Sequence, residues 1–261
     1  MAAAPGAGRR RLRPHRRTGR YPGARLLIGR RRLPRPGGAL EASGISKAYE
    51  DRPVLREVNL TVGPGQVLGV SGPSASGKTT LVGILAGTID PDAGSVQLSD
   101  VTLTDDDVLV ETDHRNLMVV QQDAVLDRNH NVAANIAYGL PKDKRRRHVG
   151  ARRVAMMMDL FELATPLADS RPQELSAGER QRVSMARAIV GFGLGGPEAA
   201  VLLDEPLSAV EVGTRVRLLQ AAFADIGAYP IPVLLVSHDA DEIAALAGRR
   251  AALVEGRLVY A

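Results

Sequence analysis

The chain of 261 residues contains no cysteine and no tryptophan, and only 3% of its residues are aromatic. The absence of cysteine excludes disulfides, thiol catalysis and cysteine-ligated zinc, and it is consistent with a reducing compartment. The chain also lacks any apolar run of about 18 residues, the length needed to cross a bilayer. We therefore expect a soluble or peripheral protein that is long enough to bury a sizeable core.

Acidic residues are absent from the first 40 residues, which contain twelve arginines. This segment carries a formal charge of +12, so the rest of the chain carries −7, because the whole chain carries +5. Five prolines and many glycines predict that residues 1–38 form a disordered tail, and they lack the apolar core of a secretory signal. Attraction to anionic lipid or nucleic acid, a merely solvated tail, a misplaced translation start and organelle targeting are all open for it.

From residue 40 onward, strand-like and helix-like segments alternate. "REVNLTV" and "GSVQL" alternate as half-exposed strands do, whereas "QVLGV", "AVLLD" and "PVLLVSH" are apolar runs typical of parallel strands covered on both faces. Strand signals disappear from about Ala124 to Val190, where "KDKRRRHVGARRVAMMMDLFEL" and "SAGERQRVSMARAIVGF" indicate helices. The sequence thus predicts an α/β core with an inserted helical subdomain.

Two features of this helical segment have simple structural interpretations. The three adjacent methionines in "AMMMDLF" point in different directions on a helix, so we expect core packing rather than a soft-metal site. We interpret the basic run from Lys142 to Arg153 as a solvated helix face, with contact to a partner as the alternative.

The segment "GVSGPSASGKTTLVGILAG" carries the first sign of chemistry. Gly72, Gly77, Lys78 and Thr79 fit the pattern G-x-x-x-x-G-K-[ST], in which backbone N–H groups surround a polyphosphate and the lysine reaches its terminal phosphates. The helix that follows, closed by Gly87, directs the positive end of its dipole at the loop. We therefore predict a nucleotide-phosphate loop, with the hydroxyl of Thr79 available to Mg²⁺.

A second apolar run, "AAVLLDEP", ends in Asp204 and Glu205. Ligands of open α/β folds gather at the carboxyl ends of such strands. Asp204 is a candidate Mg²⁺ ligand, and Glu205 is a candidate base that polarises the water attacking a γ-phosphate. A turn or helix start is the plain alternative, because Asp-Glu-Pro favours turns.

The segment "LSAGERQRVSMARAIV" resembles the signature sequence of ATP-binding cassette (ABC) ATPases, whose usual form is LSGGQ. Together with the phosphate loop and "LLDEP", it makes the chain from about Leu40 to Ala261 similar to the nucleotide-binding subunit of an ABC transporter. By resemblance, Tyr49 stacks on adenine, Gln122 is the Q-loop glutamine, and His238 is the switch histidine that contacts the γ-phosphate.

The resemblance implies a P-loop NTPase (ABC ATPase) fold of the α/β class, with a mostly parallel sheet, an N-terminal antiparallel β part and the helical insert. The ABC ATPase domain would span residues 39–261, with the helical subdomain at about 124–190. The implied cofactors are ATP and Mg²⁺. The catalytic residues would be Lys78, Gln122, Glu205 and His238, and the metal ligands Thr79, Gln122 and Asp204. The residues expected to bind nucleotide are Tyr49, Ser71, Gly72, Pro73, Ser74, Ala75, Ser76, Gly77, Lys78, Thr79, Thr80, Ser176, Ala177, Gly178 and Glu179.

The resemblance also implies partners. Ser176 and the N–H groups around Gly178 begin a helix, and by resemblance this anion site completes the ATP pocket of a second ABC ATPase subunit. We expect a homodimer around two ATP molecules that closes on binding and opens on hydrolysis. Further expected partners are transmembrane permease subunits, docked on residues 122–141, and a solute-binding protein, which places the chain at the cytoplasmic face of the membrane. We do not expect nucleic acid as a partner.

The segments after Gln122 and around His238 look like those of bacterial importers for inorganic ions or small polar solutes, such as ferric iron, sulfate, molybdate or polyamines. About two dozen residues follow His238, too few for the regulatory domain that several such importers append. Three residues depart from the family pattern: Ala177 replaces a glycine, Glu179 brings a carboxylate near the expected phosphate, and Glu211 replaces an aspartate. Two alternatives are therefore kept, a catalytically weak regulatory cassette and a soluble ABC ATPase acting on nucleic acid or ribosomes.

Overall fold

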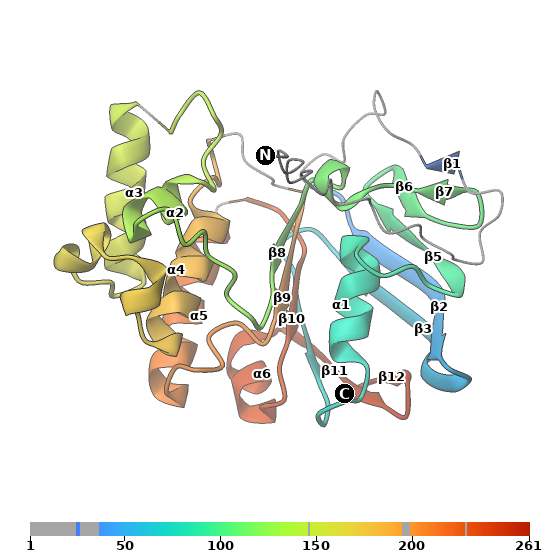
Figure 1. The fold of residues 1–261 in the computed structure, drawn as a ribbon. Helices are drawn as coiled ribbons and strands as arrows, with labels where there is room; N and C mark the ends of the chain where they lie inside the picture. The colour runs from blue at the N-terminus through green and yellow to red at the C-terminus, as the bar shows by residue number, and fades with distance from the viewer. Residues whose placement is uncertain (1–24, 27–36, 146, 195–198, 228) are drawn as a thin grey trace, which may run out of the picture.

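The computed structural model describes residues 25–26, 37–145, 147–194, 199–227 and 229–261, which form two six-stranded sheets and the helices around them (Figure 1). Sheet A has the strand order β1-β7-β6-β5-β2-β3, and sheet B has the order β12-β11-β4-β10-β9-β8. The strands of sheet A are β1 (Arg25–Leu26), β2 (Leu40–Tyr49), β3 (Arg52–Val62), β5 (Ala93–Leu98), β6 (Val101–Thr104) and β7 (Val108–Leu109). Those of sheet B are β4 (Val67–Ser71), β8 (Leu117–Val120), β9 (Ala200–Asp204), β10 (Val233–Val236), β11 (Arg249–Val254) and β12 (Arg257–Tyr260).

The described α helices are α1 (Lys78–Ala86), α2 (Val132–Ala137), α3 (His148–Leu160), α4 (Ala177–Ile189), α5 (Val212–Ile226) and α6 (Ala240–Leu246). Short 3-10 helices lie at Thr112–His114, Thr165–Asp169 and Pro172–Glu174. No helix within the described ranges is long and apolar enough to cross a bilayer.

Sheet B is parallel except for its edge strand β12 and is covered on both faces. Successive residues of β9 alternate between two hydrophobic clusters, since Ala200 and Leu202 join α1 and sheet A, whereas Val201 and Leu203 join the helices on the other face. This burial explains why β4, β9 and β10 are continuous apolar runs in the sequence. The predicted α/β fold with its parallel sheet is confirmed.

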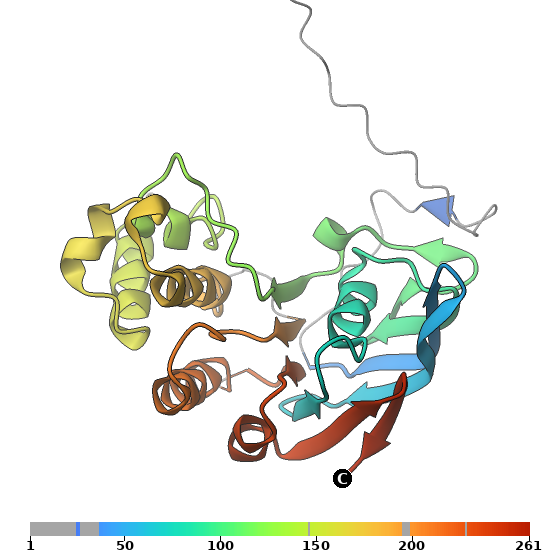
Figure 2. The ribbon, with the colours of Figure 1, turned by 60° about the horizontal axis from the view of Figure 1, so that its bottom comes forward.

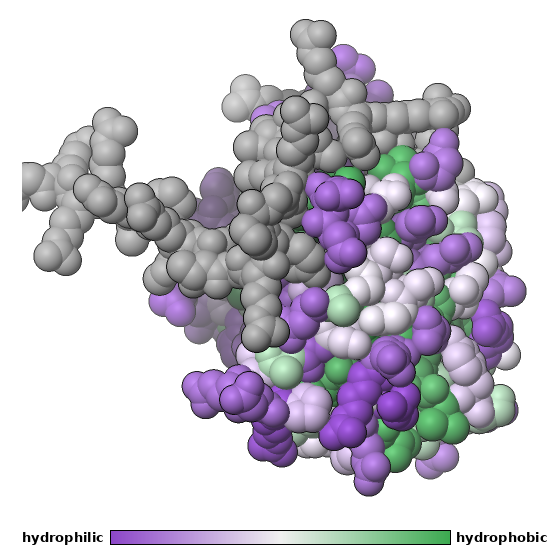
Figure 3. Space-filling model, turned by 90° about the vertical axis from the view of Figure 1, so that its right-hand side faces the viewer, coloured by the Kyte–Doolittle hydropathy of each residue, from purple (hydrophilic) through white to green (hydrophobic). Residues whose placement is uncertain are grey.

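Sheet A is the predicted antiparallel β part, and α1 packs between it and sheet B. In β3, Leu55, Val58 and Leu60 are buried while the polar residues between them are exposed, and the pairing with β2 shifts register at several places. The face on this side of the molecule accordingly mixes hydrophilic and hydrophobic side chains (Figure 3).

Helices α2, α3 and α4 gather at the side of the molecule away from sheet A (Figure 2). Met157 and Met158 are buried there, whereas Met156 is half exposed, so two of the three methionines pack in the core as expected. The expected helix from Lys142 is wrong over its first residues, because α3 begins only at His148. The basic run is also more than a solvated face: Arg145 donates to two main-chain carbonyls after α2, and Arg153 pairs with an aspartate of α5.

Arg115 is the largest side chain that is completely buried among the described residues. Its guanidinium donates to the carbonyls of Ile84 and Leu85 at the end of α1, and to the carbonyl of Val110 and the hydroxyl of Thr104 in the sheet A region. Carbonyls in the last turn of a helix lack the usual partner four residues on, and that of Ile84 also accepts from Gly87 N at 3.1 Å. One buried cation thus ties the far end of α1 to the strands beside it.

The Arg-rich tail lies outside the described residues except for residues 25–26 and 37–38. Arg25 and Leu26 pair in parallel with Val108 and Leu109, so a two-residue strand occurs within the segment for which composition predicts disorder.

Candidate functional site

Four parallel strands of sheet B end at the same edge, and each leads into a segment singled out by the sequence. The register aligns Val70 of β4 with Val236 of β10, and Val236 with Asp204 of β9, while β8 ends beside β9. The loop 72–77, Gln122, Glu205 and His238 therefore all emerge where ligands of α/β sheets bind.

The loop 72–77 leads into α1 with its backbone turned inward. Gly77 has a φ of 104°, and a Cβ on it would lie 3.0 Å from both Val54 Cγ1 and Val54 O, so glycine is required there. The buried ammonium of Lys78 donates to Gly72 O at 2.8 Å and to Pro73 O at 2.9 Å. No side chain caps α1, so its first N–H groups face the loop without a side-chain acceptor.

The two acids after β9 differ in their surroundings. Asp204 is 2% exposed, and burial raises the pKa of its carboxyl, although a hydrogen bond with Thr79 partly opposes this. Its Oδ1 atom is buried without a hydrogen-bond partner, as is Oγ of Ser76 in the loop. These two orphaned polar atoms, one after β9 and one in the loop before α1, favour a polar ligand, because buried polar groups are usually paired.

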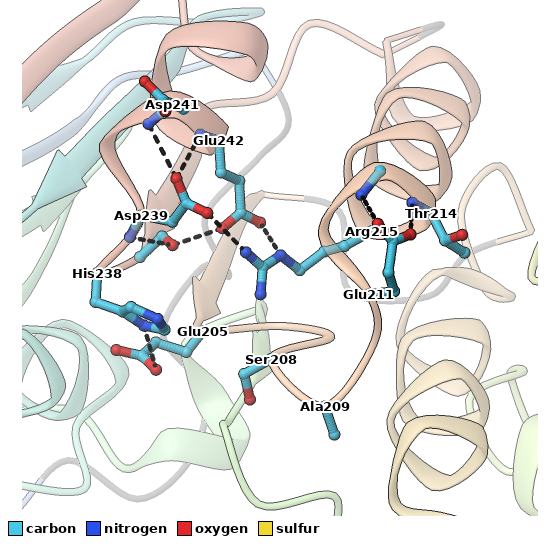
Figure 4. Close-up of polar contacts among 12 residues, drawn as sticks. Glu205, Ser208, Ala209, Glu211, Thr214, Arg215, His238, Asp239, Asp241 and Glu242 are labelled. Atoms are coloured by element: carbon cyan, nitrogen blue, oxygen red, sulfur yellow. Dashed lines mark hydrogen bonds and ion pairs between the residues drawn. The ribbon is translucent and has the colours of Figure 1, made fainter.

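Glu205 stands between the lysine and the histidine. Its Oε1 lies 3.9 Å from Lys78 Nζ, and its Oε2 lies 3.1 Å from Nδ1 of the half-exposed His238 (Figure 4). Its φ of 45° is a left-handed conformation that glutamate seldom adopts. Such conformations persist at functional sites when surrounding contacts impose them, here a hydrogen bond from Glu205 N to Val236 O at 2.9 Å.

A magnesium ion fits this arrangement only with help from a ligand. The described residues contain no group of three or more His, Cys, Asp or Glu that could hold a metal by themselves. The orphaned oxygen of Asp204 and the hydroxyl of Thr79 are oxygen donors of the kind that Mg²⁺ shares with phosphates. The structure does not bring Gln122 to them, since this residue is exposed and its main-chain carbonyl accepts a hydrogen bond from the Gln181 side chain.

A cavity of about 890 Å³ lies over the loop and the start of α1. Of the residues predicted to bind nucleotide, Tyr49 and residues 73–80 line it, whereas Ser71 and Gly72 do not. Ser71 instead donates to Ala251 O at 3.4 Å.

Sequence reasoning missed the second wall of this cavity, which consists of Arg52, Pro53, Val54, Arg56, Glu255 and Gly256. The two arginines spaced four residues apart in β3 were a usable signal, because Arg52 pairs directly with Tyr49. Residues 255–256 come from the turn between β11 and β12, and nothing local in the sequence connects them to the loop.

The signature residues lie apart from this cavity, since none of residues 176–179 lines it. Ser176 caps α4, and Glu179 turns back onto it: the carboxylate accepts from Ser176 Oγ at 2.7 Å and from Ser176 N at 2.8 Å. The hydrogen bonds from the Ser176 hydroxyl and backbone lower the pKa of Glu179. The α4 N-terminus therefore carries its own anion.

Gly178 and Gln181 of α4 contact the segment that follows Glu205. A Cβ on Gly178 would lie 3.2 Å from Ala209 O, and the Gln181 side chain bonds to Ser208 Oγ at 3.0 Å and to Ala209 N at 2.7 Å. Glu211 accepts from two N–H groups at the start of α5, which lowers the pKa of its carboxyl. Its carboxylate thus serves as a helix cap.

A protein-family model described as "ABC transporter" matches residues 55–208, which include the loop, α1, the signature segment and both acids. The chain therefore belongs to the ABC transporter family, and the predicted family is confirmed.

Curated relatives include an Fe(3+) ions import ATP-binding protein, FbpC, of Pseudomonas fluorescens, 35% identical over 223 residues and 85% of this chain. Another is FbpC 2 of Pectobacterium atrosepticum, 36% identical over 219 residues and 84% of this chain. The chain spans only about three fifths of the length of these relatives, 61% of each.

Among solved structures, the chain is similar to the ATP-binding cassette MJ0796, solved as a dimer in a post-hydrolysis state bound to ADP and Pi. The TM-score is 0.70 at 22% identity, covering 84% of this chain and 96% of the other. A second dimeric structure of the same cassette gives a TM-score of 0.69 at 23% identity. These similarities confirm the fold.

Proposed function

We propose that this chain is the ATP-hydrolysing subunit of an ABC importer for inorganic ions or small polar solutes. The observation that carries the proposal is the edge of sheet B, where the phosphate-type loop, the Lys78–Glu205–His238 contacts and the orphaned Asp204 oxygen coincide. The names of the curated relatives support iron as the first solute to test.

In the nucleotide complex, residues 72–80 surround the phosphates and Tyr49 stacks on the adenine. The Lys78 ammonium exchanges its two loop carbonyl acceptors for phosphate oxygens, which the uncapped end of α1 also attracts. The unassigned arginines of the cavity, Arg52 and Arg56, add positive charge to the wall opposite the loop.

Glu205 acts as the base that orients and deprotonates the attacking water. His238 holds the Glu205 carboxylate through Oε2, and its exposed ring reaches the γ-phosphate. Asp204 and Thr79 would hold Mg²⁺ together with the phosphates, and Gln122 would be a further ligand. When bound, the ion would neutralise negative charge on the phosphates.

The second half of each site comes from a partner cassette. None of residues 176–179 lines the cavity of its own chain, which supports use of the α4 N-terminus across a homodimer interface. ATP is then a ligand of both subunits, so its binding closes the dimer.

A permease subunit docks beside α2. A hollow of about 570 Å³ there is lined by residues of the predicted docking segment, including Val125 and Tyr138, which are 71% and 66% exposed. Large exposed apolar side chains at a concave surface support a protein contact. The subunit would then sit at the cytoplasmic face of the membrane, with a solute-binding protein on the other side.

The proposal is tested by Mg²⁺-dependent ATPase activity over a series of protein concentrations. A rate per subunit that rises with concentration supports the dimer, and Lys78→Ala is expected to weaken ATP binding strongly and to remove turnover. Glu205→Gln is expected to keep ATP binding, lower kcat by about 100-fold or more, and accumulate a dimer detectable by size-exclusion chromatography. Undiminished turnover in Glu205→Gln rules out Glu205 as the base.

One observation favours the alternative of a regulatory cassette, namely that the Glu179 carboxylate occupies the signature helix end. That alternative would be supported if the wild-type chain bound ATP without hydrolysing it and the Glu179→Gln variant hydrolysed ATP.

A further inference from the structure

Two buried charged side chains lie next to the proposed site without touching its reacting groups. Arg215 of α5 is 4% exposed, and Glu242 of α6 is 2% exposed. Burial raises the pKa of the Glu242 carboxyl, against the attraction of Arg215 and the hydrogen bond from Ser237. Charges this deep are costly to desolvate, so their presence requires an explanation beyond packing.

The two residues belong to a network that fixes the loop between β10 and α6 (Figure 4). Arg215 Nη2 donates to Asp239 Oδ2 at 3.0 Å, and Arg215 Nε lies 3.2 Å from Glu242 Oε1. Ser237 Oγ donates to Glu242 Oε2 at 2.6 Å and accepts from Asp239 N at 3.1 Å. Asp239 also caps α6 through two N–H groups. Apart from the Arg215–Glu242 contact, each of these contacts involves Ser237 or Asp239, the residues on either side of His238.

His238 itself makes only one polar contact among the described residues, with Glu205, and its side chain is 52% exposed. Its ring position is therefore decided by the backbone of Ser237 and Asp239. On one side of His238, Ser237 N donates to Val70 O of β4 at 3.2 Å. On the other side, Asp239 is the residue whose position depends on Arg215.

The opposite end of the network leads to the segment between Glu205 and α5. Arg215 N donates to Glu211 O at 2.8 Å in the first turn of α5, which Glu211 caps. Residues 208–209 of the same segment contact Gln181 of α4. A shift of α5 or of this segment is thus transmitted through a planar guanidinium, whose fork geometry allows little adjustment.

From these contacts we infer that Arg215 is a positioning residue, which sets the place of His238 against Glu205 according to the position of α5. The inference rests on the proposed function for its consequence in catalysis, but the positioning itself is testable without hydrolysis.

The first test is the NMR signal of the His238 imidazole in the full chain, assigned with His238→Gln among the five histidines. Arg215→Met is expected to shift this signal and to leave those of His114, His130 and His148 in place, while Arg215→Lys shifts it less. Arg153→Met is the matched control. Arg153 of α3 also binds α5, through Asp225 at 2.9 Å, but neither residue contacts the Arg215 network. An unchanged His238 signal in Arg215→Met and Arg215→Lys overturns the inference.

The second test is a double-mutant cycle on the ATPase rate. Arg215→Met is expected to lower kcat by about 10- to 100-fold with KM for ATP nearly unchanged, since small misplacements near reacting groups have effects of this size. In a His238→Ala background the same change is expected to lower kcat by less than about twofold. Arg153→Met is expected to keep the wild-type kcat.

If the losses of kcat caused by Arg215→Met and His238→Ala multiplied in the double variant, the inference would be overturned and the proposed function would stay intact. An inactive wild-type chain would contradict the proposed function, and the NMR shift would still decide whether Arg215 positions His238.

Discussion

Helices α1 and α4 both begin at a place suited to an anion, yet they satisfy their first N–H groups in opposite ways. At α1 no side chain caps the helix, and a buried lysine and an unpaired serine hydroxyl lie in the loop before it. At α4 the Ser176–Glu179 capping box fills the same role from within the chain. Helix ends are stabilised either by such caps or by a ligand. The N-terminus of α1 can therefore accept a bound anion directly, whereas an anion that binds at α4 has to displace the Glu179 carboxylate.

The largest expected effect comes from removing the cation at α1. Lys78→Ala is expected to weaken ATP binding by about 100-fold or more, because it removes a charge-assisted contact with the phosphates and leaves loop carbonyls unpaired. Lys78→Arg keeps the charge and serves as the control. The measurement is ATP affinity by calorimetry, and equal affinities of wild type and Lys78→Ala would break the comparison by showing that α1 is not the phosphate site.

Asp204→Asn is expected to raise stability while abolishing Mg²⁺-dependent turnover. Burial raises the pKa of Asp204, so its contribution to stability is present below pH 3.8 and is lost as the pH rises through the folded-state pKa. At neutral pH the charge therefore destabilises the protein, and each kcal/mol recovered raises Tm by about 2–4 °C. The check is a thermal scan at pH 7 without nucleotide, and a Tm below that of wild type would contradict it.

Ser176→Ala is expected to remove the cap of α4 and to lower stability by about 1 kcal/mol. No equivalent loss of stability can be produced at α1, because no side chain caps that helix. Urea unfolding measures the loss, with Ser208→Ala as a control serine on the neighbouring segment. Equal stability of Ser176→Ala and wild type would show that the capping box does not stabilise α4.

The smallest expected effect concerns pH. Hydrogen bonds from Ser176 lower the pKa of Glu179, so its stabilising contribution is full above pH 4.5 and is lost as the pH falls through the folded-state pKa. Glu179→Gln is expected to flatten the decline of Tm between pH 5 and pH 3 relative to wild type, as seen by circular dichroism. Glu179→Gln also removes the carboxylate that competes with a bound phosphate at α4. Tighter nucleotide-driven dimerisation of this variant would sharpen the comparison between α1 and α4. Parallel declines of Tm in the two proteins would contradict the assigned cause.

Much of the site was readable from the sequence because its parts follow apolar strands of one parallel sheet. The spacing of Gly72 to Thr79 and the position of Asp204 and Glu205 after β9 depend on local patterns, and the register of parallel strands brings them together. The fold class followed from the same runs.

The parts that escaped prediction depend on contacts between distant segments. Gly256 approaches the loop region through a turn near the end of the chain, and Arg56 N donates to its carbonyl at 2.8 Å. The buried charges of Arg215 and Glu242 look like surface residues of amphipathic helices, because only the tertiary structure reveals what covers them. The start of α3 was misplaced since Arg145 binds carbonyls after α2 and holds the preceding residues in a turn.

The division of the core by sheet B has a consequence for cooperativity. One hydrophobic cluster joins α1 to sheet A, and the other joins α2–α6 to the opposite face, so the backbone of the central strands is the boundary between them. Local unfolding on the helical side can then proceed without opening the packing around α1, which Arg115 also anchors. Amide hydrogen exchange is expected to record the two sides as separate units, with the phosphate loop joined to the unit that contains α1.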